Sequence, residues 1–442
     1  MWGIAIYALI FSGFVAILIR NKGLQLDAIP RSWLVFAFIA KAIVGGMFYW
    51  VYTTYYTQQS TLPDAFRYVH DAQLIADVLP NNPNVFSSIM LGYASQDPAY
   101  QHLTEQMIGW HSGYLYGLTN DCSTIIRLNV PIALFSGRSF MVHALIFSIA
   151  SFIGCLLLFL AFKPYLNKYF QCIAFAVIFL SPTQLFWTCS PTKEAALMPV
   201  FGGLFYLLSM MHQQKFRLHH LWWFLLIIPG LVFIKQYVLY ALIPGVLYFL
   251  VQRGFNKTRP IYVWCAVMLL CGIIADNAHH VFIGGDFLYV INKKLTDFNN
   301  LAAIQQAGSH VYVAPTHTWV DFGLNYPAAF AQSYLRPWIW ECKSWIYVPF
   351  AIENTLLIGL VLITLWKRPS TKRSVQPLIG VMLASILVMA GILGNTVPIL
   401  GAIVRYRTPG LLLLCLLCLI FLQGSFDKNS LEKNSMSKPL GN

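Results

Sequence analysis

Charged side chains are scarce in this sequence, and acidic ones are the scarcest. Of its 442 residues only 10% are Asp, Glu, Lys or Arg and only 16 are Asp or Glu, whereas 58% are hydrophobic. A water-soluble domain needs charge at about a quarter of its positions to form its surface. The scarcity therefore excludes a soluble globular protein and indicates a chain that lies mostly within a membrane.

Metal-binding and disulfide spacings are also missing. The nine cysteines stand mostly alone within apolar runs, where a thiol behaves as a small hydrophobic group. We therefore expect no metal site and no cofactor. The net charge is +13, but the basic residues do not cluster on a soluble domain as a nucleic-acid partner requires, so we expect no nucleic acid among the partners. No internal repeat of the kind found in many transporters is present.

The sequence does contain a series of apolar segments, each close to the roughly 20 residues that a helix needs to cross a bilayer. The first segment lacks a basic n-region and a small-residue cleavage site, so we expect it to remain as an anchor. The pattern predicts an all-α polytopic membrane protein with about eleven transmembrane helices. These helices are expected at residues 2–20, 32–52, 139–162, 169–187, 194–211, 220–234, 238–252, 260–277, 345–366, 375–394 and 407–423.

Basic residues concentrate in alternate connections, which the positive-inside rule assigns to the cytoplasm, leaving the N-terminus outside. Two long external loops, residues 53–138 and 278–344, mix aromatic residues, Pro, Gly and short amphipathic stretches. We expect them to form a small cap on the membrane surface. Residues 1–423 are interpreted as a single transmembrane domain. Residues 424–442 are interpreted as a disordered cytoplasmic tail because they are polar and poor in aromatic residues.

Two carboxylates, Asp64 and Asp71, lie on one face of a helix expected directly after the second apolar segment, in the sequence DAFRYVHDA. A general base must lie within reach of the proton that it removes. Their position at the membrane edge therefore favours these two residues as bases over carboxylates deeper in the loops. The ordinary alternative is a solvated helix on which both carboxylates form weak ion pairs with Arg67.

Several basic residues depart from the positive-inside rule because they lie at external connections or span ends. These residues are Lys193, Lys235, Arg336, Lys343, Arg405 and Arg407. An anionic ligand at the outer leaflet would account for them. Each also has an ordinary explanation: Lys193 and Glu194 as a solvated pair at a helix start, and the others as snorkelling or interfacial side chains. Lys41, within an expected span, is assigned no role.

Three of these features together resemble the GT-C class of membrane glycosyltransferases. They are the acidic residue in the first large external loop, the Lys-Glu pair after SPTQLFWTCSPT, and the sequence RYRTP before the last span. The segment YLRPWIWECKSWIYVPFAIENTLL also looks like a pattern in uncharacterised bacterial membrane proteins associated with cell-surface polysaccharide loci. The resemblance extends over roughly residues 60–410, and its motifs are short and degenerate.

The resemblance implies an external active site in a bacterial inner membrane and a sugar donor linked through phosphate to a polyprenyl lipid. Asp64 would be the base that deprotonates the acceptor hydroxyl, and Asp71 a second acidic residue. Arg405 is then the preferred phosphate ligand, with Lys193 and Lys235 as further candidates. Other substrate-binding candidates are Glu194, Tyr237, Arg336, Glu341 and Arg407. The implied partners are the lipid-linked donor, a saccharide, lipid or protein acceptor, and membrane lipids. Here, however, the acidic loop follows the second span rather than the first, and no adjacent acidic pair is present.

Other functions remain open. A polymerase or ligase of lipid-linked saccharides would handle the pyrophosphate with arginines and would need no acidic base. A lipid-linked saccharide transporter or flippase would place ionisable residues along the spans near the midplane. A purely structural membrane scaffold leaves the external cations unexplained.

Overall fold

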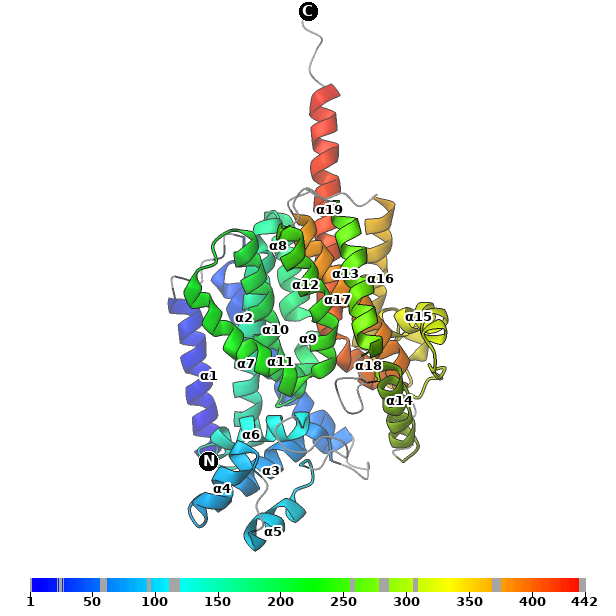
Figure 1. The fold of residues 1–442 in the computed structure, drawn as a ribbon. Coiled ribbons are helices and arrows are strands. Elements are labelled where there is room, and N and C mark those ends of the chain that lie inside the picture. The colour runs from blue at the N-terminus through cyan, green and yellow to red at the C-terminus, as the bar shows by residue number, and fades with distance from the viewer. Residues whose placement is uncertain are drawn as a thin grey trace, which may run out of the picture. The chain divides into compact units, whose positions relative to one another are not determined.

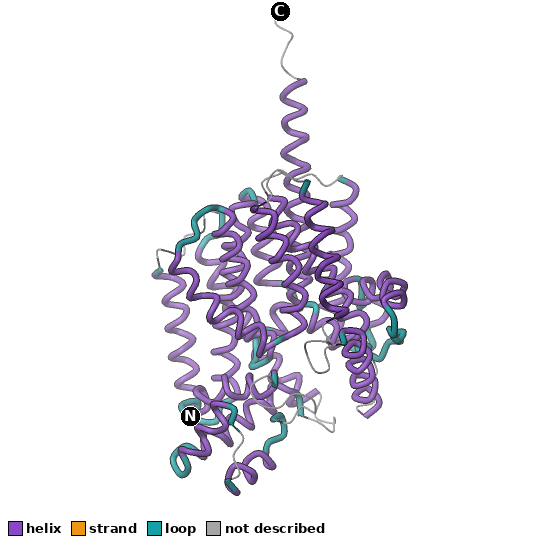
Figure 2. The backbone as a smooth tube through the Cα atoms, viewed as in Figure 1, coloured by secondary structure: helices purple, strands orange, loops and turns teal. Residues whose placement is uncertain are grey.

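The fold was analysed in a computed structural model that describes residues 2–21, 23, 26, 28–55, 62–93, 97–110, 120–254, 259–277, 286–304, 309–367 and 375–436. The regular structure of these residues is helical, accompanied only by isolated β-bridges (Figure 2). The prediction of an all-α fold is confirmed.

Ten helices among the described residues are long and apolar enough to cross a membrane. Each coincides with a predicted span. The remaining predicted span, residues 220–234, corresponds to a shorter apolar helix, Leu218–Ile234. The chain is therefore a polytopic integral membrane protein.

The chain forms two compact units. Unit 1 contains Met1–Ala161 and Ile178–Gln236, and unit 2 contains Phe162–Val177 and Tyr237–Asn442. The sequence pattern of apolar segments carries no signal for this division, because it reports which helices enter the bilayer and not which helices pack together.

Unit 1 contains long apolar helices and a group of shorter helices at one end of them (Figure 1). Its elements are α1 (Trp2–Arg20), α2 (Arg31–Trp50), α3 (Asp64–Val78), α4 (Pro83–Leu91), α5 (Pro98–Gln106), α6 (Asp121–Ala133), most of α7 (Phe140–Phe162), the end of α8 (Lys168–Leu180), α9 (Pro182–Trp187), α10 (Lys193–His212) and α11 (Leu221–Ile234). The Phe38 ring lies 4.6 Å from Phe14 and 5.6 Å from Phe152, which joins α2 to α1 and α7. Unit 1 thus has an aromatic core within its long helices.

The loop predicted at residues 53–138 contains the helices α3 to α6, and α3 packs along α6. Their starts follow from local sequence. The side chains of Asn82, Asp97 and Asn120 accept hydrogen bonds from the first backbone N–H groups of α4, α5 and α6, at 3.2, 2.8 and 2.9 Å. Such caps satisfy donors that a helix start otherwise leaves unpaired.

Unit 2 is organised around α17 (Gln376–Thr396), most of which is buried. Its elements are most of α8, α12 (Gln236–Gly254), α13 (Pro260–Asn277), α14 (Phe287–Ile304), α15 (Trp319–Tyr334), α16 (Val348–Trp366), α17 (Gln376–Thr396), α18 (Leu400–Tyr406) and α19 (Thr408–Met436). Helix α17 packs against α13, α14, α15 and α19. A Cβ at Gly394 would lie 2.2 Å from the Ala329 carbonyl oxygen, so glycine is what permits this approach of α15 to α17.

Two boundaries matter for the interpretation. Lys235 separates α11 from α12, and its backbone is not helical (φ −154°, ψ 87°), so the two short apolar runs form two helices as predicted. Helix α19 continues to Met436, whereas we expected disorder from residue 424. Helix propagation adds one hydrogen bond for each residue fixed, and no proline interrupts the sequence before Pro439.

Candidate functional site

The candidate site in unit 1 is built around the first turn of α10. Thr192 caps this helix by accepting a hydrogen bond from Ala195 N–H at 3.3 Å, and Lys193 and Glu194 follow directly. Consecutive residues on a helix point in directions about 100° apart. The Lys193 and Glu194 side chains therefore reach different partners.

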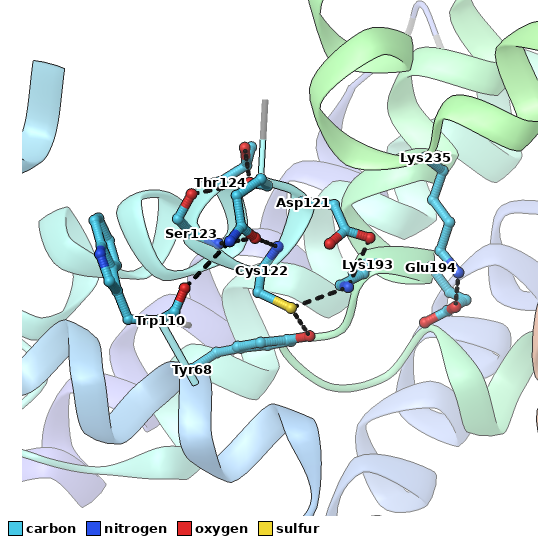
Figure 3. Close-up of polar contacts among 10 residues, drawn as sticks. Tyr68, Trp110, Asp121, Cys122, Ser123, Thr124, Lys193, Glu194 and Lys235 are labelled. Atoms are coloured by element: carbon cyan, nitrogen blue, oxygen red, sulfur yellow. Dashed lines mark hydrogen bonds and ion pairs between the residues drawn. The ribbon is translucent and has the colours of Figure 1, made fainter. Parts of the chain in front are cut away.

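Lys193 contacts residues from two other helices (Figure 3). Its ammonium lies 2.7 Å from the Asp121 carboxylate and 3.2 Å from Cys122 Sγ, both at the start of α6. It also lies 6.0 Å from the centre of the Tyr68 ring on α3, and Tyr68 Oη lies 3.5 Å from the same sulfur. The lysine thus joins α3, α6 and α10 in one polar cluster.

Glu194 pairs with Lys235 at 2.8 Å (Figure 3). The side chains are only 4% exposed for Lys235 and 2% for Glu194. Because a buried charge needs a close partner, each group fixes the other in place. Lys235, a further candidate for a phosphate ligand, therefore has Glu194 as its partner.

Asp121 is more accessible than Glu194, the carboxylate of the other ion pair, because its side chain is 37% exposed. Burial alone would raise its pKa. The charge and hydrogen bond of Lys193, with a smaller effect of Lys235, outweigh burial and hold the pKa of this carboxyl below its usual value. Asp121 is thus kept ionised and able to accept a proton. It lies in the first turn of α6, where the helix dipole also favours negative charge.

Asp64 is the first residue of α3 and is half-buried. It lies one helical turn before Tyr68, on the same face of the helix, and its charge acts on Lys193. Among the predicted site residues, Asp64, Lys193, Glu194 and Lys235 therefore belong to one cluster.

Asp71 has a different environment. It is fully buried, and its carboxylate accepts hydrogen bonds from Ile108 N–H at 3.0 Å and Gly109 N–H at 2.7 Å, with His70 Nδ1 at 3.0 Å. This arrangement holds residues 108–109 against α3. We assign Asp71 a structural role in place of the expected catalytic one.

The other predicted residues belong to unit 2. Arg336 forms an ion pair with Glu341, whose second oxygen accepts from Trp338 N–H at 2.9 Å. Tyr237 donates a hydrogen bond to the Tyr406 carbonyl at 2.7 Å. Arg405 lies over the Tyr406 ring at 5.8 Å.

Arg407 is fully buried in unit 2, contrary to the expectation of an interfacial or ligand-binding side chain. Its Nη1 donates to the carbonyls of Ser333 (3.3 Å) and Arg336, and to Asn354 Oδ1 at 3.1 Å. The bonds from this one buried nitrogen hold separate segments of unit 2 together. Arg407 is therefore a structural residue.

Sequence reasoning missed the importance of Asp121 and Cys122. The available signal was the Asn120-Asp121 pair before an amphipathic helix, which is a helix-start pattern. Lys41, to which we assigned no role, is buried within α2 and donates to Thr188 Oγ1. Within the described residues, no group of three or more His, Cys, Asp or Glu side chains is placed to hold a metal ion.

Comparison of the chain with protein-family models, with curated proteins and with solved structures finds no match. The geometry of the site therefore carries the functional argument.

Proposed function

We propose that this protein transfers a sugar from a polyprenyl-phosphate-linked donor to a cell-envelope acceptor, and that the reaction takes place at the unit 1 cluster. The observation that carries the proposal is the ion pair of Lys193 with Asp121, where α10, a candidate membrane span, begins. The charge of Asp64, a second partly exposed carboxylate, also acts on this ammonium. A lipid-linked substrate needs such a position, since its phosphate stays at the bilayer surface.

The cluster provides both chemical functions that the reaction requires. The departing lipid phosphate gains negative charge as the glycosidic bond breaks, so a fixed ammonium such as that of Lys193 stabilises the transition state more than the ground state. A carboxylate removes the proton of the attacking hydroxyl. When the phosphate approaches Lys193, the Asp121 carboxylate loses its partner and becomes a stronger base.

Two carboxylates compete for the role of base. Asp64 has the position that the family resemblance implies, and Asp121 makes the direct contact with Lys193. In this proposal the buried Glu194–Lys235 pair holds the first turn of α10 in place and does not contact the substrate. The positive-inside distribution of Lys and Arg favours the external face of a bacterial inner membrane for the whole cluster.

The experiment is a transfer assay with purified full-length protein, a panel of polyprenyl-phosphate sugars and candidate acceptors. Removing the base should lower the turnover rate by about 10²–10⁴-fold, so Asp64→Asn and Asp121→Asn identify the base. Asp77→Asn is the matched control, because Asp77 makes an exposed ion pair with Arg138. Full activity in both Asp64→Asn and Asp121→Asn would instead support a polymerase or ligase that relies on arginines alone.

A lipid-linked saccharide transporter is the second candidate, because several charged groups are buried inside the protein. Lys41, the Glu194–Lys235 pair and Arg407 are all nearly inaccessible. Intramembrane ionisable residues commonly mark translocation pathways. Movement of a lipid-linked sugar across liposomes that contain the purified protein, without formation of a new glycosidic bond, would favour this function.

A further inference from the structure

An open cavity of about 510 Å³ lies in unit 2, between α14 and the extended segment at residues 309–317. One wall is a single face of α14, whose lining residues have the spacing i, i+3, i+4 and i+7. They are Asn292, Leu295, Thr296 and Asn299. The opposite wall consists of His310, Tyr312, Val313, Pro315 and His317. No residue of this cavity belongs to the unit 1 cluster.

Backbone and amide contacts hold the extended wall in place. Val311 N–H donates to the Pro398 carbonyl at 2.7 Å, and Leu400 N–H donates to the Ser309 carbonyl at 3.1 Å. These bonds attach the segment to the start of α18. The cavity is therefore preformed on this side, which lowers the conformational cost of binding.

The Asn292 side chain fixes the other end of the extended segment. Its amide group accepts from Thr316 N–H at 2.9 Å and donates to the Thr316 carbonyl. The Thr316 side chain is in turn bonded to Asn395 of α17 at 3.1 Å. Asn292 is thus part of the framework of the cavity.

The chemistry of the lining points to a neutral ligand. The described residues that line the cavity include no Asp, Glu, Lys or Arg. Lys293 and Lys294 lie next to lining residues in the sequence of α14 but are not part of the lining. Asn299 and His310 contact each other at 3.0 Å, and both are exposed. Amide and imidazole groups each offer hydrogen-bond donors and acceptors without a fixed net charge.

Tyr312 adds an exposed aromatic side chain to the lining, since the residue is 79% exposed. A sugar ring presents apolar C–H faces and a rim of hydroxyls, each of which both donates and accepts. An exposed tyrosine beside amide and imidazole groups matches this combination. We propose that the cavity is a binding site for a neutral saccharide. The inference goes beyond the proposed function, since saccharide binding here does not depend on whether unit 1 transfers a sugar.

The test is saturation-transfer NMR on the full-length protein in nanodiscs, without any donor lipid. The probes are neutral hexamers of glucose, galactose, mannose and N-acetylglucosamine, with hexagalacturonate as the charged comparison. At least one neutral hexamer should bind, and Tyr312→Ala and Asn299→Ala should each weaken that binding by about tenfold. Tyr289→Ala is the matched control, because Tyr289 is an exposed tyrosine of α14 outside the lining and its loss should not alter binding.

Three results would overturn the proposal: no binding of any neutral hexamer, binding of hexagalacturonate alone, or unchanged binding in both cavity variants. Binding of hexagalacturonate alone would indicate that Lys293 and Lys294 bind an anionic saccharide instead. Because no transfer is measured, these results are independent of the Asp64 and Asp121 assay, and either proposal can fail while the other stands.

Discussion

Glu194 lies 2.8 Å from Lys235, although the residue next to it in the chain, Lys193, is also a lysine. Lys193 instead pairs with Asp121 at 2.7 Å. The Lys-Glu sequence at the start of α10 is therefore not a solvated pair of neighbours. It connects α10 to α6 on one side and to the end of α11 on the other.

Breaking the Glu194–Lys235 pair should strongly destabilise the protein. Glu194→Gln or Lys235→Met leaves an uncompensated buried charge, which costs about 3–5 kcal/mol. The double variant Glu194→Gln/Lys235→Met removes both charges and should recover most of that loss. The free energy of unfolding of detergent-solubilised protein is the measurement. Additive losses in the double variant would show that the two charges are not coupled.

Asp71→Asn should affect stability rather than the chemical step. The amide retains one acceptor oxygen but directs an N–H group toward the backbone N–H of Ile108 or Gly109, and an unsatisfied buried group costs about 1–3 kcal/mol. We expect a lower melting temperature with an unchanged turnover rate at a temperature where the protein is folded. Asp77→Asn, on the exposed end of α3, is the control with little effect on either quantity. A large fall in turnover at full stability would return Asp71 to the catalytic residues.

The helices could be predicted from the sequence, and the reason is physical. An apolar run of transmembrane length has almost no other stable structure in lipid, since backbone groups must bond within the segment. The same argument does not extend to the loops or to the pairing of helices. The close contact of Gly394 with Ala329, which allows α17 to approach α15, depends on a pair of positions far apart in the sequence.

The candidate site was only partly predictable. Lys193 and Lys235 attracted attention because they violate a topology rule, and Asp64 because it lies at a membrane edge. Asp121 does not depart from the topology rule, and its contact with Lys193 arises only from the tertiary structure. Asp71 and Arg407 show a different limit, because sequence alone does not reveal that their side chains bond to buried backbone groups.

Gly154 and Gly202 should be intolerant of any side chain. A Cβ at Gly154 would lie 2.2 Å from the Met198 carbonyl carbon, and one at Gly202 would lie 2.0 Å from the Gly154 oxygen. Because backbone rather than a flexible side chain is in the way, α7 and α10 would have to separate. Gly154→Ala should cost about 1–3 kcal/mol or more in unfolding free energy. Gly46→Ala on α2 meets no atom within 4 Å and should be neutral or slightly stabilising, so equal effects of the two variants would contradict this packing.

Arg407→Leu should destabilise unit 2. The substitution leaves the acceptors on Ser333, Arg336 and Asn354 without their buried donor, at about 1–3 kcal/mol for each group left unsatisfied. Arg253→Gln, an exposed arginine at the end of α12, should change the unfolding free energy by no more than about 0.5 kcal/mol. Thermal unfolding of both variants provides the comparison, and similar melting temperatures would mean that Arg407 is not a structural residue.

The pH dependence of stability should reveal the link between Asp121 and Lys193. Lys193 holds the pKa of Asp121 below its usual value, so the folded state binds the proton less readily than the unfolded state. The resulting stabilisation is fully present above the unfolded pKa of about 3.9 and is lost as the pH falls through the lower native pKa. Subtracting the curve of Asp121→Asn from that of the wild type, between about pH 7 and about pH 3, isolates this contribution.

Lys193→Met provides the matching test of the cause. Without the ammonium, burial is the largest remaining influence and raises the pKa of Asp121. The folded state of this variant then binds the proton more readily than the folded wild type does. The loss of stability at low pH that depends on Asp121 should therefore be smaller than in the wild type. If the difference curves with and without Lys193 had the same slope, a group other than Lys193 would keep Asp121 ionised. The proposal that Asp121 becomes a stronger base when a phosphate binds Lys193 would then lose its basis.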